Sequence, residues 1–243
     1  MSPADLSPAQ FADLSAHLAA SSLSEVLRWA WETFGQSAAI GTSFQGAGIV
    51  MLHHAVRAGL PLPIFTLDTG LLFQETLQTK ERLEAFLGIE IQSISPVLSL
   101  EAQSRELGAE LWKTRPDTCC QVRKVEPLRE HLKSLSLWIT GTRSEQADTR
   151  RGVGILERYL FDPLSERYIL KLSPMVAWKK EEVWEYIREH ELPYNPLHDL
   201  GFRSIGCRPC TRASGDGESE RAGRWTGFDK TECGIHTFLN PAT

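Results

Sequence analysis

The sequence predicts an α/β domain whose mostly parallel sheet carries helices on both faces. Between residues 37 and 143, short apolar segments containing Ile, Phe and Thr alternate with longer segments of helical periodicity. Such an alternation joins parallel strands through crossover helices. In addition, 243 residues can bury the core of one domain of this kind but are few for two domains.

The first helices and strands follow from local patterns. Residues 8–34 are expected to form two helices, because "SSLSEVLRWAWETF" offers a Ser cap followed by apolar residues at helical spacing. The strands of the main domain are predicted at residues 37–44, 63–67, 89–94 and 137–143. The helices that follow these strands are predicted at residues 48–59, 74–87, 99–107 and 120–134.

The later part of the chain is less regular. A β-hairpin is predicted from residues 153–161 and 167–172, and a helix over 179–190 is stopped by Pro193. The segment "RASGDGESERAGRW" is rich in Gly, Ser and charge, which is typical of a mobile linker. We therefore expect N-terminal helices over residues 1–34 packed on the main domain, an α/β domain over 35–212 and a flexible tail over 213–243.

Composition excludes several classes of protein. A hydrophobic content of 42% and a charged content of 23% are typical of a soluble globular protein, and no apolar run is long enough to cross a bilayer. The first residues lack the pattern of a secretory signal, so a cytoplasmic protein without membrane contact is predicted. A formal net charge of -5 argues against a general nucleic-acid binder.

Arginines are nevertheless concentrated in two stretches. This pattern fits either a solvated surface or a site for a small anionic ligand. The two stretches contain Arg143, Arg150 and Arg151, and Arg203, Arg208, Arg212, Arg221 and Arg224.

The five cysteines lie at positions 119, 120, 207, 210 and 233. Structural disulfides are rare in a reducing compartment, so the two close pairs are better explained as four thiolate ligands of a metal site. Zinc and iron-sulfur clusters both accept four thiolates. If Cys119 and Cys120 open a helix, their side chains diverge by about 100°. That divergence favours a cluster over a single zinc ion but leaves both open.

Cys233 is the cysteine left over. It follows a mobile segment, where a reactive thiol is useful, and "TECGIH" offers few apolar neighbours to bury it. A buried structural cysteine is the alternative. His236, three residues on, is a candidate for orienting the thiol or contacting a phosphate, although a lone histidine is as often a bystander.

These motifs resemble those of the assimilatory adenylyl-sulfate (APS) and phosphoadenylyl-sulfate (PAPS) reductases. The resemblance spans about residues 35–237. It rests on several segments in the order of the family, namely "TSFQGAGIVMLHH", "TLDTGLLFQET", "CCQVRKVEPL", "TGTRSEQADTR", "CRPC" and "ECGIH".

The resemblance implies an adenine nucleotide α-hydrolase-like sheet with the nucleotide at the carboxyl ends of its strands. It implies that Cys233 is the catalytic nucleophile and that Lys124 lies between substrate and cluster. The implied ligands of one 4Fe-4S cluster are Cys119, Cys120, Cys207 and Cys210. The residues implied to contact the substrate are Ser43, Phe44, Gly46, Ala47, Leu67, Asp68, Thr69, Gly70, Arg143, Gln146, Arg221 and Arg224.

The phosphate loop departs from similar loops at two positions. Those loops often carry acidic residues where this chain has Gly48 and Ile49, so any role of such acids is in doubt here. The loop also lacks the SGGxDS pattern of ATP pyrophosphatase relatives. This difference weakens the alternative of an ATP-dependent sulfurtransferase of the same fold.

The expected reaction is the thioredoxin-dependent reduction of APS to sulfite and AMP through an S-sulfocysteine on Cys233. PAPS is the alternative substrate, and a zinc-binding interaction module is a more remote possibility that leaves Cys233 without a role. The expected partners are APS or PAPS, thioredoxin or a similar dithiol, and further copies of the chain in a homo-oligomer.

Overall fold

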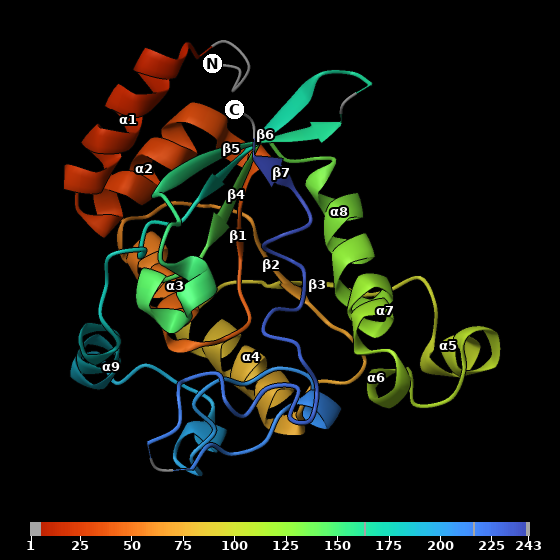
Figure 1. Ribbon diagram of the computed structural model, residues 1–243. Coiled ribbons are helices and arrows are strands. Elements are labelled where there is room, and N and C mark those ends of the chain that lie inside the picture. Colours follow the sequence, from red (N-terminus) through yellow and green to blue (C-terminus); the bar gives the residue numbers. More distant parts are fainter. Residues whose placement is uncertain (1–5, 163, 216, 242–243) are drawn as a thin grey trace.

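The computed structural model describes residues 6–162, 164–215 and 217–241. Its centre is one seven-stranded sheet with the strand order β3-β2-β1-β4-β6-β5-β7 (Figure 1). The strands are β1 Ala38–Gly41, β2 Ile64–Leu67, β3 Gln92–Ile94, β4 Leu137–Thr140, β5 Leu156–Asp162, β6 Arg167–Leu172 and β7 Asn240–Pro241. The neighbouring pairs from β3 to β6 are parallel, whereas β5 pairs antiparallel with both β6 and β7.

Two α-helices precede the first strand, and helices join the parallel strands as βαβ units require. The α-helices are α1 Pro8–Ala20, α2 Leu23–Phe34, α3 Gly46–Arg57, α4 Gln74–Leu87, α5 Leu100–Leu107, α6 Leu111–Thr114, α7 Pro116–Cys120, α8 Glu126–Leu132 and α9 Lys180–Glu189. A π-helical segment, η3 Gln121–Val125, joins α7 to α8 without a break.

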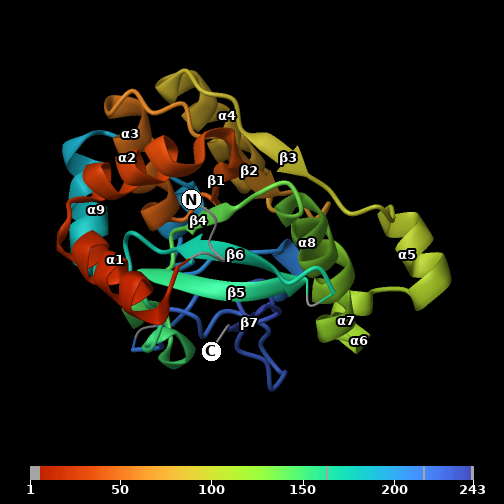
Figure 2. The ribbon, with the colours of Figure 1, turned by 90° about the horizontal axis from the view of Figure 1, so that it is seen from above.

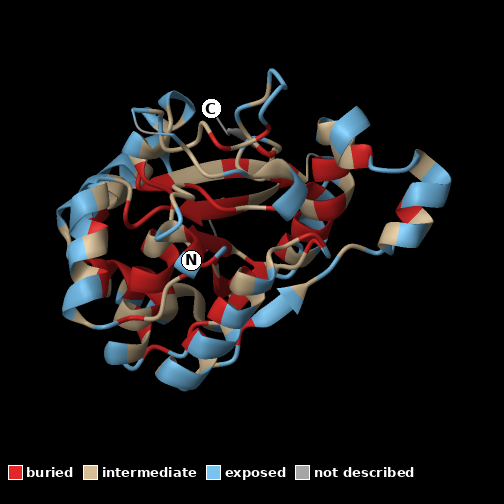
Figure 3. Cartoon of the chain, turned by 90° about the horizontal axis from the view of Figure 1, so that it is seen from below, coloured by how far each residue is buried: buried red, intermediate tan, exposed pale blue. Residues whose placement is uncertain are grey.

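Helices cover both faces of the sheet, which confirms the predicted fold class. On one face, α2, α3, α4 and α9 pack against a core that includes Ile40 and Ile139 (Figure 2). On the other face, α8 and the C-terminal segment cover Phe65 and Trp138. Figure 3 shows the buried residues concentrated along the sheet and the helix faces that contact it.

Most predicted elements differ from the observed ones by a few residues at their ends, where local patterns are least informative. The helix predicted over residues 120–134 is the main correction. It begins at Pro116, a favourable first residue of a helix, so Cys119 and Cys120 lie inside a helical run and do not open it. The short helix α6 and the strand β7 were not predicted.

The C-terminal segment folds back on the domain. Thr211 and Arg224 form an antiparallel bridge, the Trp225 amide donates to the Cys210 carbonyl at 3.1 Å, and β7 extends the sheet beside β5. Leu239 is buried against the sheet. Mobility of this tail stays a prediction, as do the domain boundaries at residues 34 and 212.

The N-terminal helices share the core of the main domain. Leu18 of α1 and Leu27 of α2 are buried in the same cluster as the sheet residues. Two capping boxes, at Ser7 and Ser22, begin these helices. Within the described ranges, no helix combines the length and apolarity needed to span a membrane.

Candidate functional site

A cavity lies at the carboxyl ends of β2, β1 and β4, three neighbouring parallel strands. Its floor comes from the ends of these strands and the residues that follow them, including Thr42, Thr66 and Thr140. The chain runs from β1 outward to β2 and β3 and later returns to place β4 on the other side of β1. Loops therefore diverge between β1 and β4, which is where ligands bind in open α/β sheets.

The turn from β1 into α3 forms one wall. Phe44 has a positive φ of 58°, which turns the chain sharply, and its amide donates to Thr42 Oγ1 at 3.1 Å. Gly48 is required by packing, because a Cβ at this position would lie 2.5 Å from Thr42 Oγ1. Ile49 belongs to the core. Close packing thus explains both departures from the acidic loop pattern.

The turn after β2 is held from behind by Arg123. This buried guanidinium donates to the Thr69 carbonyl, and to Gln103 Oε1 at 2.9 Å. Within the turn, Asp68 Oδ1 accepts from the Gly70 amide at 2.9 Å, and Gly70 has a φ of 69°. Asp68 and Gly70 therefore shape the turn, whereas Leu67 and Thr69 line the cavity.

The π-helical segment and the C-terminal segment close the cavity from the opposite side. Lys124 of η3 lines it together with Arg221, Arg224, Cys233 and His236. Arg224 lies over the Trp225 ring, with its guanidinium carbon 4.4 Å from the ring centroid. Cations are thus concentrated beside one thiol, as an anionic ligand requires.

Cys233 is 9% exposed and packs with Cys120 and Trp225, so the expectation of an exposed thiol is wrong. Cys120 comes from a distant part of the chain, whereas Trp225 and Ile235 belong to the same C-terminal segment as Cys233. Burial alone would raise the pKa of the Cys233 thiol, but Lys124, the Ile235 backbone and Arg224 outweigh it and lower the pKa. A thiol with a lowered pKa is the more reactive kind.

Lys124 stays protonated among these sulfur atoms. Burial by itself lowers the pKa of its ammonium group, but the charges of Cys207, Cys233 and Cys120 outweigh burial and raise the pKa. The lysine thus supplies a positive charge between Cys233 and the cysteine pairs.

The two cysteine pairs meet in adjoining clusters. Cys119 packs with Cys207 and Leu71, Cys120 packs with Cys233, and Cys210 contacts both clusters. The side chains of the adjacent pair therefore diverge as a helix requires. Among the described residues, no three metal-binding side chains converge on a position for a metal ion.

The thiols of the two pairs repel one another when they are ionised. Burial, followed by the charges of Cys120, Cys207 and Cys210, raises the pKa of the Cys119 thiol to about 12. A metal group offsets such repulsion and makes thiolates stable in a buried site.

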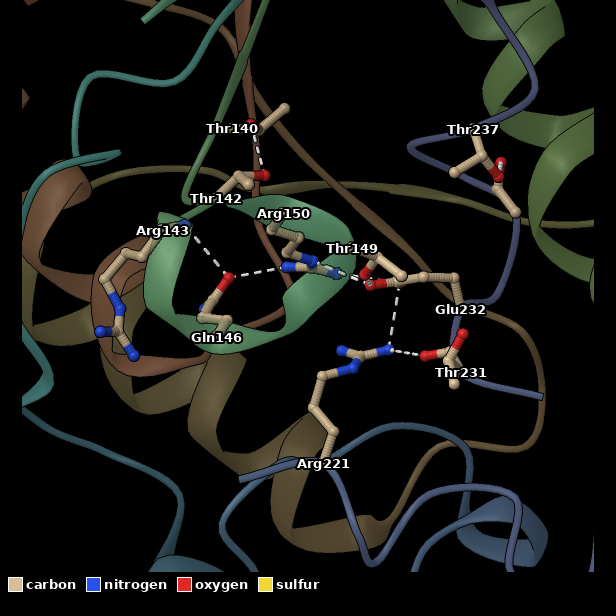
Figure 4. A network of polar contacts seen from close by, with 11 residues as sticks. Thr140, Thr142, Arg143, Gln146, Thr149, Arg150, Arg221, Thr231, Glu232 and Thr237 are labelled. Carbon is tan, nitrogen blue, oxygen red and sulfur yellow. Dashed lines mark hydrogen bonds and ion pairs between the residues drawn. The ribbon is translucent and has the colours of Figure 1, made fainter. Parts of the chain in front are cut away.

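Arg150 and Glu232 join the two sides of the cavity (Figure 4). The Arg150 guanidinium donates from Nε and Nη2 to the two Glu232 oxygens, at 2.9 and 3.0 Å. Arg221 Nη2 donates to the same carboxylate at 3.1 Å, and Gln146 Oε1 accepts from Arg150 at 2.6 Å. Gln146 thereby orients an arginine that lines the cavity.

The structure brings most of the expected substrate residues to the cavity. Those that line it are Ser43, Phe44, Leu67, Thr69, Lys124, Gln146, Arg221, Arg224 and His236, together with Cys233. The cavity lining does not include Gly46, Ala47, Asp68, Gly70 or Arg143.

Gly46 and Ala47, the first residues of α3, pack closely against neighbouring elements. A Cβ on Gly46 would lie 2.8 Å from Val183 of α9, and Ala47 faces Gly141. Arg143 is the larger correction: its guanidinium is buried and forms ion pairs with Glu145 and, at 3.3 Å, with Glu220. Figure 4 shows it directed away from Glu232.

Sequence reasoning missed several residues of the cavity wall. Arg150 was named only as part of a basic stretch that fits an anionic ligand, and not among the residues expected to contact the substrate. Trp138 carried no signal, because an aromatic residue within a strand is usually a core residue. Other missed residues include Thr42, Gln45, Thr140, Thr142 and Glu220.

The sheet and the cavity at its carboxyl edge define an adenine nucleotide α-hydrolase-like α/β protein. Candida glabrata FMN adenylyltransferase shares this fold, with a TM-score of 0.57 at 11% identity over 90% of this chain and 76% of its own. Within this class, the chain belongs to the phosphoadenosine phosphosulfate reductase domain family, whose pattern matches residues 37–213.

Individual members of the family are similar over most of their length. Adenosine 5'-phosphosulfate reductase 2 of Bacillus subtilis (strain 168) is 43% identical, with 87% of this chain and 88% of the relative covered. The adenosine 5'-phosphosulfate reductase of Salinibacter ruber is 42% identical, with 87% and 82% covered. The crystal structure of phosphoadenylyl-sulfate reductase from Candida auris superimposes with a TM-score of 0.74 at 30% identity, covering 86% of this chain and 98% of that chain.

Proposed function

We propose that this protein reduces APS to sulfite and AMP with electrons from a thioredoxin-like dithiol. The observation that carries the proposal is the position of Cys233, a thiol of lowered pKa that lines a cation-rich cavity at the carboxyl edge of the sheet. The names of the relatives at 42–43% identity support APS as the substrate.

The start of α3 receives the negatively charged part of the substrate. The first amides of this helix have no partner within the helix, and Gln45 provides no side-chain cap. Such amides favour phosphate or sulfate oxygens. The adenosine then lies toward Leu67 and Thr69, at the end of the neighbouring strand.

In the first step, the Cys233 thiolate attacks the sulfonyl sulfur. A bond between the two sulfur atoms forms as the bond from that sulfur to the bridging oxygen breaks, and AMP leaves with the electron pair of the broken bond. Lys124, Arg221 and Arg224 stabilise the charge that shifts onto the phosphate oxygens. The product is an S-sulfocysteine at position 233.

In the second step, a thiolate of the dithiol attacks Cys233 Sγ and sulfite leaves with the electron pair of the sulfur-sulfur bond. The second thiol of the partner then reduces the mixed disulfide and restores the Cys233 thiolate. The dithiol becomes a disulfide and so supplies both electrons. Because Cys233 is buried, the tail has to move before the partner can reach it.

A 4Fe-4S cluster belongs to the proposal. The thiolates of Cys119, Cys120, Cys207 and Cys210 would hold it, and when bound it would supply a structural anchor and an electrostatic field near Lys124. The two thiol steps already balance the electrons of the reaction, so the residues described above account for the chemistry. Free thiols require a reducing compartment, and we therefore propose a cytoplasmic enzyme.

The experiment is a parallel rate measurement with APS and PAPS, using reduced thioredoxin and a sulfite assay. We expect sulfite to form and kcat/KM to be higher for APS. A higher kcat/KM for PAPS would assign the protein to PAPS reduction. If neither substrate yields sulfite, the proposal is wrong and the alternatives are the sulfurtransferase and the zinc-binding module.

A further inference from the structure

Glu232, the residue before Cys233, is the meeting point of two cavity arginines. Its carboxylate accepts two hydrogen bonds from Arg150 and one from Arg221, as described above, and Thr149 Oγ1 donates at 3.2 Å. Only 11% of the Glu232 side chain is exposed. Charge-assisted hydrogen bonds of this geometry are among the stronger polar contacts in proteins.

The two arginines stand between this carboxylate and the cavity. Arg150 and Arg221 line the cavity, whereas Glu232 does not. Arg221 Nε is buried and has no hydrogen-bond partner among the described residues. Arg221 can therefore bind an oxyanion with this nitrogen while Nη2 stays on Glu232.

Without a bridging carboxylate, two guanidinium groups in this position repel each other. Burial lowers the pKa of Arg221 to about 10, and Glu232 opposes that effect while Arg150 reinforces it. Burial alone would raise the pKa of the Glu232 carboxyl, but its hydrogen bonds and ion pairs with Arg150 and Arg221 lower it. The carboxylate is therefore ionised at neutral pH and neutralises part of the arginine charge.

We propose that Glu232 is a positioning residue whose carboxylate bridges Arg150 and Arg221 and thereby anchors the Cys233 segment at the rim of the cavity. The two bonds from Arg150 tie residue 232 to the segment after β4, which is distant in sequence, and the bond from Arg221 ties it to an earlier part of the tail. The inference deepens the proposed function, on which it rests for the role of Cys233.

Removing the charge of Glu232 has two consequences, one that weakens the positioning of Cys233 and one that strengthens the binding of an anion. The anchor weakens, so the Cys233 thiol becomes more accessible and is held less well for attack. At the same time, a negative charge disappears from behind the two arginines, so the cavity attracts an anion more strongly. A purely structural loss of the tail would instead weaken anion binding, because Arg221 and Arg224 belong to that tail.

The test compares the Glu232→Gln variant with wild-type protein, both purified without air so that any bound cluster is retained. Glu218→Gln is the matched control. Glu218 of the tail forms a bidentate pair with Arg212, with both distances 2.9 Å; the pair is more exposed than that of Glu232, and neither residue lines the cavity.

Two properties are measured. The first is the rate at which iodoacetamide alkylates Cys233, followed by peptide mass spectrometry. We expect a rise of about tenfold in Glu232→Gln, the effect of losing roughly one charge-assisted hydrogen bond, and a change below about twofold in the control. The second is the affinity for AMP, measured by calorimetry, which we expect to increase about threefold or more in Glu232→Gln.

Equal alkylation rates in Glu232→Gln and wild-type protein would overturn the proposal. Faster alkylation together with weaker AMP binding would also overturn it, because that pattern means that the cavity wall itself has been lost. Neither measurement requires sulfite formation. An absence of reductase activity would therefore count against the proposed function and leave the positioning role to be judged by alkylation and AMP binding.

Discussion

The imidazole of His236 stacks on the indole of Trp138, with ring centroids 5.4 Å apart and ring planes inclined by 8°. The contact joins the tail to a strand at the centre of the sheet, three residues from Cys233. Trp138 Nε1 and His236 Nδ1 are both buried without a hydrogen-bond partner in the described part of the chain. The stack therefore contributes mainly through ring contact.

His236→Ala removes this contact, and His236→Phe retains a ring. We expect the alanine variant to lose about 1 kcal/mol of unfolding free energy, typical of an aromatic pair, and the phenylalanine variant to lose less. Urea denaturation of the three proteins in parallel measures the difference. Equal losses in both variants would show that the imidazole nitrogen matters more than the stacking.

Cys233→Ser should abolish sulfite formation while iron content and AMP affinity stay at wild-type values. A serine hydroxyl ionises far less readily than a thiol and is a weak nucleophile toward sulfur. With APS labelled in its sulfonyl sulfur and no reductant, wild-type protein should retain label that thioredoxin releases as sulfite. Full activity in the variant, or label on another cysteine, would make Cys233 a structural residue.

Protein purified without air should contain about four iron atoms and about four sulfide ions per chain, as expected for one cluster of this type. Cys207→Ser should lose most of the iron, because it removes one of four thiolates, whereas Cys233→Ser serves as the control that retains it. Metal and sulfide analysis provides both readouts. Stoichiometric zinc without sulfide would contradict the cluster.

The lowered pKa of His54 predicts that the unfolding free energy depends on pH. Burial, assisted by the charges of His53, Arg57 and His190, lowers its pKa to about 4. The folded pKa is thus below the unfolded value of about 6.5, so the unfolded state binds the proton more readily between these values. Stability from this group is complete above about pH 6.5 and is lost as the pH falls toward 4.

The measurement compares urea denaturation of wild-type protein and His54→Phe at several pH values from 7.5 to 5. Phenylalanine keeps a ring beside Tyr186, whose ring centroid lies 4.9 Å from that of His54. We expect wild-type protein to lose about 1–2 kcal/mol more than the variant over this range, allowing for partial exposure. Parallel curves for the two proteins would contradict the assignment.

The strands, helices and cysteine sets were predictable because each depends on a local pattern. Apolar segments of strand length alternating with helical periodicity were sufficient for β1, α3 and β2. The helix that carries Cys119 and Cys120 was placed too late in the chain, because the start signal at Pro116 was not used.

The sequence by itself determined the α/β class, the presence of four paired cysteines and one unpaired thiol, and the concentration of arginines near the chain's end. Only the tertiary structure decided that Cys233 is buried beside Cys120 and Trp225, that Arg143 is paired with Glu220, and that Arg150 meets Glu232 at the cavity. The physical reason is the sequence separation of the residues that interact. Secondary structure follows contacts between near neighbours, whereas burial and ion pairing depend on which distant segments the fold brings together.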